Sequence, residues 1–121
     1  MAFVTGPDFI TLHVRDLEAS RRFYEDLIGL KPSPEKRPNA VAFSTKPAGF
    51  AIRQAEIDLE AVSLLSYGVL VWFKADDSAA LLERLRKHGV KIIKDLAEGP
   101  FGKTFTFQDP DGYPITVHDG G

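Results

Sequence analysis

The chain has 121 residues, 44% of them hydrophobic, and this size and composition predict one compact domain that buries its own core. It has no cysteine, which excludes a disulfide framework, thiolate chemistry and a cysteine-ligated metal. The 15 basic and 17 acidic residues are spread along the sequence, and without a basic cluster nucleic acid is excluded as a partner.

The beginning of the chain has no targeting or membrane signal. Residues 1–9 contain no basic segment followed by a long apolar one, and no apolar run elsewhere approaches the length that spans a bilayer. We therefore expect a cytoplasmic protein without a membrane partner.

The first half of the chain predicts a strand, a helix and two further strands. Asp16 provides an N-cap for the helix, and Gly29 ends it, because the residue after the last turn often needs a positive φ. Three prolines after Gly29 predict an extended or looped segment. The strands are predicted at 9–14, 40–44 and 50–54, from alternating or β-branched residues between turn signals.

The second half repeats this order. Asp76 or Asp77 caps a second helix, which Gly89 ends. The segment Asp109–Gly112 has the proline and glycine positions of a type I turn and predicts a hairpin. Strands are predicted at 68–74, 90–94, 104–108 and 113–118.

The repeated order predicts an α+β fold of two βαβββ modules within a single domain, 1–121. The first module covers about 7–54, the linker 55–66 and the second module about 67–119. Two curved mixed sheets related in this way create a concave cleft, which is the usual position of a ligand.

Both ends of the sequence resemble one superfamily. The segment Leu12–Leu30 resembles the first module of the vicinal-oxygen-chelate proteins, which include glyoxalase, bleomycin-resistance and dioxygenase relatives. Phe107–Gly112 is similar to their last hairpin, and Gly68–Phe73 with Gly99–Lys103 looks closest to the metal-free, bleomycin-resistance-like branch. The resemblance implies paired βαβββ modules, a homodimer and a small-molecule cleft.

The resemblance also implies where members that do chemistry hold a divalent ion, namely on the first and last strands of each module. In this sequence those positions are Phe9, Arg53, Gly68 and Thr116. None of them offers a good lone pair, and a divalent ion needs about three protein ligands. We therefore expect no metal and no cofactor, and the chain leans towards binding rather than catalysis.

Period-two alternation groups further side chains with these positions. The resulting cleft is largely aromatic and apolar with a few polar groups, which suits planar, amphipathic ligands. Its predicted members are Phe9, Thr11, His13, Arg53, Leu70, Trp72, Thr116 and His118. Alternatively, Phe9 and Trp72 fill a core, and Arg53 forms a surface ion pair with Glu56 or Asp58.

Three functions follow from this sequence. The favoured one is metal-independent sequestration of an aromatic or heterocyclic small molecule, such as an antibiotic, by a homodimer. The alternative is an enzyme of the lyase, isomerase or dioxygenase type that uses a non-standard metal site, or His13 and His118 as acid and base. The third is an interaction module whose cleft is filled. No catalytic residue is assigned.

Overall fold

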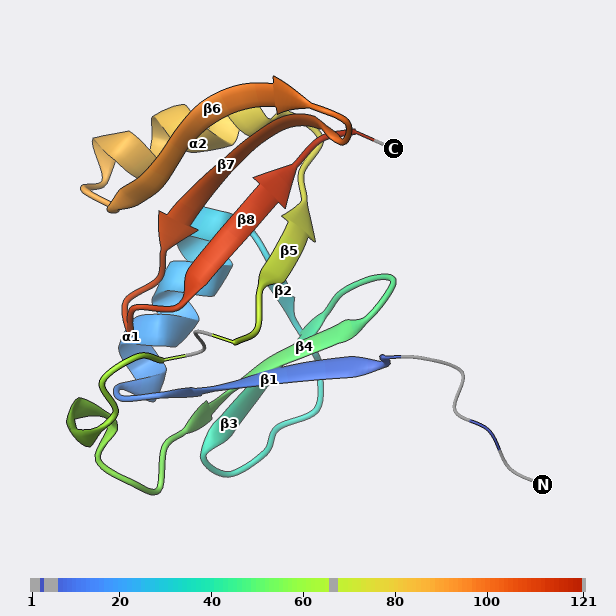
Figure 1. Ribbon diagram of the computed structural model, residues 1–121. Helices are drawn as coiled ribbons and strands as arrows, with labels where there is room; N and C mark the ends of the chain where they lie inside the picture. Colours follow the sequence, from blue (N-terminus) through green and yellow to red (C-terminus); the bar gives the residue numbers. More distant parts are fainter. Residues whose placement is uncertain (1–2, 4–6, 66–67, 121) are drawn as a thin grey trace. The chain divides into compact units, whose positions relative to one another are not determined.

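Two four-stranded sheets, one in each half of the chain, form the fold (Figure 1). The structure, a computed structural model, describes residues 3, 7–65 and 68–120. The chain divides into two units, Met1–Ala61 and Val62–Gly121, and each combines strands with helix, as the α+β prediction requires. The single domain with modules at 7–54 and 67–119 stays a prediction, and the predicted junction at 66–67 lies outside the described residues.

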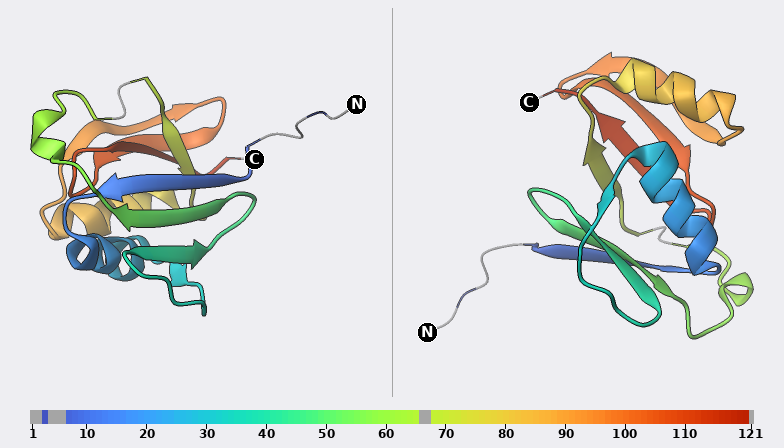
Figure 2. Two further views of the ribbon diagram at one scale, coloured as in Figure 1. Left: turned by 90° about the horizontal axis from the view of Figure 1, so that it is seen from below. Right: turned by 180° about the vertical axis from the view of Figure 1, so that it is seen from behind.

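The first unit has a mixed sheet in the order β1-β4-β3-β2, in which β1 and β4 are parallel. Figure 2 shows β1, β4 and β3 side by side. Its elements are β1 (Phe9–Val14), α1 (Leu17–Arg22), the π-helical turn η1 (Phe23–Ile28), β2 (Lys31–Pro32), β3 (Ala40–Ser44), β4 (Gly49–Gln54) and the short η2 (Leu59–Ala61).

Local sequence explains how α1 begins and where η1 ends. The carboxylate of Asp16 accepts a hydrogen bond from the N–H of Ala19, which makes Asp16 the predicted N-cap. Gly29 ends η1 with a φ of 92°, a conformation that a residue with a Cβ rarely adopts. The Gln54 side chain accepts a hydrogen bond from the N–H of Leu17 and donates one to the carbonyl of Arg15, so the end of β4 holds the turn between β1 and α1.

Aromatic rings fill the core of the first unit. Tyr24 is fully buried, and its ring centroid lies 5.1 Å from that of Phe50 and 6.3 Å from that of Phe43. Leu12 and Val14 of β1 are buried on the same side of the sheet. Because side chains alternate along a strand, the other residues of β1 and β4 face away from this core.

The second unit has the sheet order β5-β8-β7-β6, again with a parallel pair, β5 and β8. Its helix lies against β6 and β7 (Figure 1). The elements are β5 (Val71–Lys74), α2 (Ser78–Lys87), β6 (Ile92–Gly99), β7 (Gly102–Gln108) and β8 (Pro114–His118). Asp77, rather than Asp76, caps α2 by accepting a hydrogen bond from the N–H of Ala80.

Two predicted strands differ from the structure by three residues or more at one end. The strand predicted at 68–74 begins only at Val71, so Gly68 is not a strand residue. Continuing the parallel pairing backwards would place Leu70 opposite Pro114, which has no N–H to donate. The strand predicted at 90–94 instead runs from Ile92 to Gly99, with register shifts that allow it to follow β7 to the hairpin.

The predicted turn at Asp109–Gly112 is built around one carboxylate. Asp109 is buried, and its Oδ1 accepts hydrogen bonds from the N–H groups of Asp111 and Tyr113, both at 2.9 Å. The turn thus joins β7 to β8, whose inward side chains form the core with α2. These buried residues are Phe105, Phe107, Ile115, Val117, Leu82 and Leu85. Among the described residues, no helix is long and apolar enough to cross a membrane.

Candidate functional site

One face of the first sheet carries three of the predicted cleft residues on β1. Phe9, Thr11 and His13 are all exposed, whereas the residues between them face the core or are partly buried. The pairing of β1 with β4 places Arg53 beside His13 on this face. Phe9 is 55% exposed, so it does not fill the core of this unit.

A pocket of about 410 Å³ lies on this face. Its floor contains three alanines, Ala40 and Ala42 from β3 and Ala51 from β4, and their small side chains leave room above the sheet. Phe9, Thr11 and Arg53 line the pocket, and His13 lies on the same face but does not line it. The volume falls in the range of small-molecule sites, and an apolar floor with a few polar groups is typical of them.

Glycine at position 49 positions the ring of Phe9. A Cβ at Gly49 would stand 2.6 Å from the Cδ2 of Phe9, so the ring lies across the glycine of the neighbouring strand. An aromatic ring over a cross-strand glycine covers an otherwise open part of the sheet. It forms an apolar wall at the Gly49 end of the pocket.

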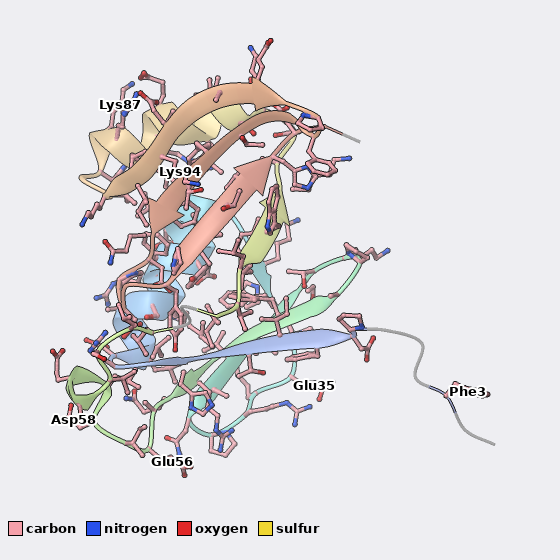
Figure 3. The ribbon with its side chains drawn as sticks, viewed as in Figure 1. Phe3, Glu35, Glu56, Asp58, Lys87 and Lys94 are labelled. Atoms are coloured by element: carbon pink, nitrogen blue, oxygen red, sulfur yellow. The ribbon has the colours of Figure 1, made fainter. Side chains whose placement is uncertain are left out.

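Two arginines line the pocket, and they differ in their partners. The Nη2 of Arg37 lies 3.1 Å from the Oε2 of Glu35 and forms an ion pair with it. Both residues belong to the loop between β2 and β3, and Figure 3 labels Glu35. Arg53 has no ion pair or hydrogen bond among the described residues, including Glu56 and Asp58, the surface partners that the alternative assigned to it. Its guanidinium is therefore available to a ligand.

In the second unit, Trp72 and His118 belong to a cluster of three rings. Their centroids lie 5.9 Å apart, and the ring of Phe101 lies 5.8 Å from Trp72 and 6.3 Å from His118, all edge-to-face. Trp72 is 46% and Phe101 52% exposed. The Nδ1 atom of His118 is buried and has no hydrogen-bond partner among the described residues. The cluster thus combines stacking surface with one unsatisfied polar atom.

Two other predicted residues, Thr116 and Leu70, belong to this unit. Thr116 pairs with Trp72 across the strands, and its hydroxyl lies 2.9 Å from that of Thr106, with either one able to donate. Leu70 is exposed and lies just before β5. The two predicted histidines belong to different units, His13 to the first and His118 to the second.

Asp119 fixes the hairpin loop that carries Phe101. Its carboxylate accepts hydrogen bonds from the N–H of Lys103 at 2.8 Å and from the N–H of Ser78, at the start of α2, at 3.2 Å. The N–H of Gly120 donates to the carbonyl of Phe101 at 2.7 Å. The ring of Phe101 is therefore held in place by the chain that follows β8.

The pKa of Asp119 gives a testable pH dependence. The N–H groups of Lys103 and Ser78 lower this pKa from its ordinary value of 3.8. Because the folded-state pKa is lowered, the carboxylate stabilises the loop fully above pH 3.8, and this contribution is lost as the pH falls through the folded value. We expect the fluorescence of Trp72, the only tryptophan, to show an acid transition below about pH 4 as this carboxylate is protonated.

The matched variant for this measurement is Asp119→Ala, which removes the titrating group. We expect its Trp72 emission to be altered already at neutral pH and to lack the acid transition. If the variant keeps the acid transition of the wild type, the assignment to Asp119 is wrong.

A second pocket of about 410 Å³ lies at the end of the second unit where β5 and β8 finish. Its lining is mostly acidic, and none of the predicted cleft residues contributes to it. The charged residues are Asp76, Asp77, Glu98, Lys103 and Asp119. Asp77 and Asp119 already accept backbone hydrogen bonds, so these two carboxylates have structural roles.

The N-cap positions and the strand registers correct two of the four positions to which the resemblance assigns metal ligands, Gly68 and Arg53. Phe9 precedes the N-cap Asp16 by as many residues as Leu70 precedes the N-cap Asp77, so Leu70, not Gly68, is the counterpart of Phe9. Thr116 pairs with Trp72, the counterpart of Thr11, and Thr11 pairs with Ala51.

The counterpart of Thr116 is therefore Ala51. The counterpart of Arg53 is instead His118. Arg53 pairs with His13 and His118 pairs with Lys74, and His13 and Lys74 occupy equivalent positions in β1 and β5. The sequence lacked this information, because it does not show which residues of β1 and β4 lie side by side.

The corrected positions do not fit a divalent ion. Phe9, Leu70 and Ala51 have hydrocarbon side chains, and the hydroxyl of Thr116 already bonds to Thr106. Within residues 7–65 and 68–120, no three His, Asp or Glu side chains come together as a metal site. Neutral hydroxyl and hydrocarbon groups do not supply the donors that such an ion needs.

The sequence did not predict several residues that line the pocket of the first unit or form the ring cluster of the second. The alanine floor was visible as small residues alternating in 40–44 and 49–51, but small residues in a strand do not by themselves indicate a pocket. Arg37 and Glu35 lie in a proline-rich loop whose course no periodicity predicts. Phe101 was noted only as part of the hairpin, although its position between Gly99 and Gly102 marks a tight connection.

Comparison with known proteins identifies the family. The model of the Glyoxalase/Bleomycin resistance protein/Dioxygenase superfamily matches residues 6–117. A protein of unknown function from Agrobacterium tumefaciens is 29% identical with a TM-score of 0.77, over 100% of this chain and 98% of that one. The fosfomycin resistance protein FosX from Mesorhizobium loti is 25% identical with a TM-score of 0.74, over 98% and 95%.

An antibiotic-binding protein from a Streptomyces species, TnmS3, shares the fold at a TM-score of 0.72 and 18% identity, over the whole of both chains. The match of the family model covers nearly the entire sequence, and each of the two units has the βαβββ order of elements that the resemblance implied. The chain belongs to the Glyoxalase/Bleomycin resistance protein/Dioxygenase superfamily.

Proposed function

We propose that this protein binds an aromatic or heterocyclic small molecule, antibiotic-like in size, and sequesters it without metal and without chemical change. The observation that carries the proposal is the pocket on the first sheet, in which an alanine floor, the ring of Phe9 and Arg53, which has no partner among the described residues, form one surface. Such a surface offers shape, stacking and one charge, which are the means of binding rather than of bond cleavage.

The second unit supports the proposal with its three-ring cluster. Trp72 and Phe101 are about half exposed although Asp119 and Gly120 fix the loop beside them, so little ordering is needed before a ligand stacks on them. The buried Nδ1 of His118 lacks a partner among the described residues, and a polar ligand group would satisfy it.

The description of one similar structure supports a binding role for this chain. One similar structure is described as an antibiotic-binding protein and another as a fosfomycin resistance protein. We include in the proposal the homodimer that the resemblance implies and a cytoplasmic location. The ligand of this chain is proposed from its own pocket, because these relatives share the fold and differ at most positions.

The proposal is tested by a thermal-shift screen of aromatic drugs and metabolites, with and without EDTA. A ligand that binds only the folded state stabilises it by about 2.7 kcal/mol at a concentration one hundred times its Kd. We expect at least one ligand to raise the Tm, with the same shift in EDTA and in added divalent metal. The bound ligand is then recovered and compared with the starting compound by mass spectrometry.

Two results would contradict sequestration. A large rise in Tm from Zn²⁺, Mn²⁺, Ni²⁺ or Co²⁺ alone would indicate a metal site and favour the enzyme alternative. A chemically changed ligand would do the same. In that case His118 is the first candidate for proton transfer, because its buried Nδ1 has no hydrogen-bond partner in the part of the chain that the structure describes.

A further inference from the structure

The pocket of the first unit carries an inference about the class of its ligand, which rests on the function proposed above. We propose that the ligand is an elongated aromatic acid. Arg53 binds its carboxylate, and its rings lie on the alanine floor towards Phe9.

The charges that line the pocket favour an anion. Three ionisable side chains line it, and Arg37 and Glu35 form an ion pair with each other at 3.1 Å. Arg53 is left as the uncompensated charge among the described lining residues. Its cross-strand neighbours, His13 and Ala40, carry no carboxylate.

A guanidinium beside an apolar floor recognises a particular group. Its planar fork donates two parallel hydrogen bonds to a carboxylate, and this pairing is stronger than a bond between neutral groups. A cationic ligand would instead be repelled by the like charge of the guanidinium. This repulsion costs more free energy where the apolar floor excludes water. The pocket therefore selects against cationic aromatic drugs.

The strand register sets the length of the ligand. Phe9 lies across Gly49 at one end of the pocket, and Arg53 is four residues further along the same strand. At roughly 3.3 Å per residue, the two ends lie on the order of 13 Å apart. A two-ring acid reaches from the wall at Phe9 to the guanidinium, whereas a single-ring acid contacts only one of them.

The experiment uses matched probes and calorimetric titration. Biphenyl-4-carboxylate is compared with biphenyl-4-methanol, which has the same rings without the charge, and with benzoate, which has the charge with one ring. We expect the two-ring acid to bind about tenfold more tightly than either, because the charge-assisted bond and the ring contact are separate contributions. The preference for the acid should weaken as salt is added.

Variants assign the preference to Arg53. Arg53→Gln should bind the acid about tenfold more weakly and the alcohol with unchanged affinity. The affinity of Arg53→Lys for the acid should lie between those of the wild type and Arg53→Gln, because lysine keeps the charge but cannot donate two parallel hydrogen bonds. Lys87→Gln is the matched control, since it removes one positive charge from the exposed surface of α2 (Figure 3) and lines neither pocket.

The outcomes separate this inference from the proposed function. Equal affinity for acid and alcohol, or an Arg53→Gln protein that keeps the preference, overturns the inference while leaving a small-molecule binding protein. If neither biphenyl compound binds while a neutral or cationic compound raises the Tm in the screen, the inference of an aromatic acid is overturned and the proposed binding function remains. If no compound in the screen raises the Tm, the proposed function itself is overturned. Circular dichroism of each variant confirms that it is folded.

Discussion

Replacement of Tyr24 by alanine is expected to cost about 3–5 kcal/mol of the free energy of unfolding. The ring is fully buried and packs edge-to-face on Phe23 at 5.2 Å, as well as on the rings of Phe43 and Phe50. Deleting it leaves a cavity between η1 and the sheet, and the surrounding strands cannot close it without losing their own pairing. Since domains of this size have roughly 5–15 kcal/mol in total, the loss is severe.

Urea denaturation followed by far-ultraviolet circular dichroism measures this loss. The control is Phe9→Ala, which removes a ring from the same unit, but one that is 55% exposed. We expect that variant to lose about 1 kcal/mol or less, because surface substitutions rarely cost more. Equal losses in both variants would contradict the division between a core face and an open face of the first sheet.

The second large effect is expected at Gly102. This glycine has a φ of 87°, where a residue with a Cβ is strained by roughly 1–2 kcal/mol. A Cβ there would also stand 2.5 Å from the Oδ1 of Asp119 and 2.6 Å from the backbone nitrogen of Gly120. Gly102→Ala must therefore displace the chain that fixes Phe101, and we expect a total cost of about 2 kcal/mol or more.

Trp72 reports this displacement directly. The contact between Trp72 and Phe101 depends on the loop, so Gly102→Ala should alter the tryptophan emission as well as the stability. Gly99→Ala is the matched control in the same hairpin, since a Cβ at Gly99 meets nothing within 4 Å. An emission spectrum that stays unchanged in Gly102→Ala would show that the loop does not position the ring of Phe101.

The elements of the fold were predictable wherever local chemistry decides them. Asp16 accepts a backbone N–H at the start of α1, and Gly29 ends η1 with a positive φ, as the sequence indicated. The strand β1 begins and ends where alternation predicted, and β3 where the neighbouring turn signals predicted. The start of β5 was wrong by three residues, because its first partner on β8 follows a proline that cannot donate.

The candidate site was predictable only in part. Alternation alone grouped Phe9 with Thr11 and His13, because successive side chains of a strand must face opposite ways. It also indicated that Trp72 and His118 share a face, and their rings are in contact. The partners that decide their roles, Phe101 at Trp72 and the alanine floor between Phe9 and Arg53, come from segments distant in sequence.

By itself, the sequence determined the α+β class, the order of elements in each half and the superfamily. These depend on residue type and on neighbours within a few positions along the chain. Only the tertiary structure decided which residue of β4 stands beside which residue of β1, and therefore that Ala51 rather than Arg53 matches Thr116. A shift of one residue in strand pairing reverses every side chain, and hydrophobicity alone does not distinguish registers two residues apart.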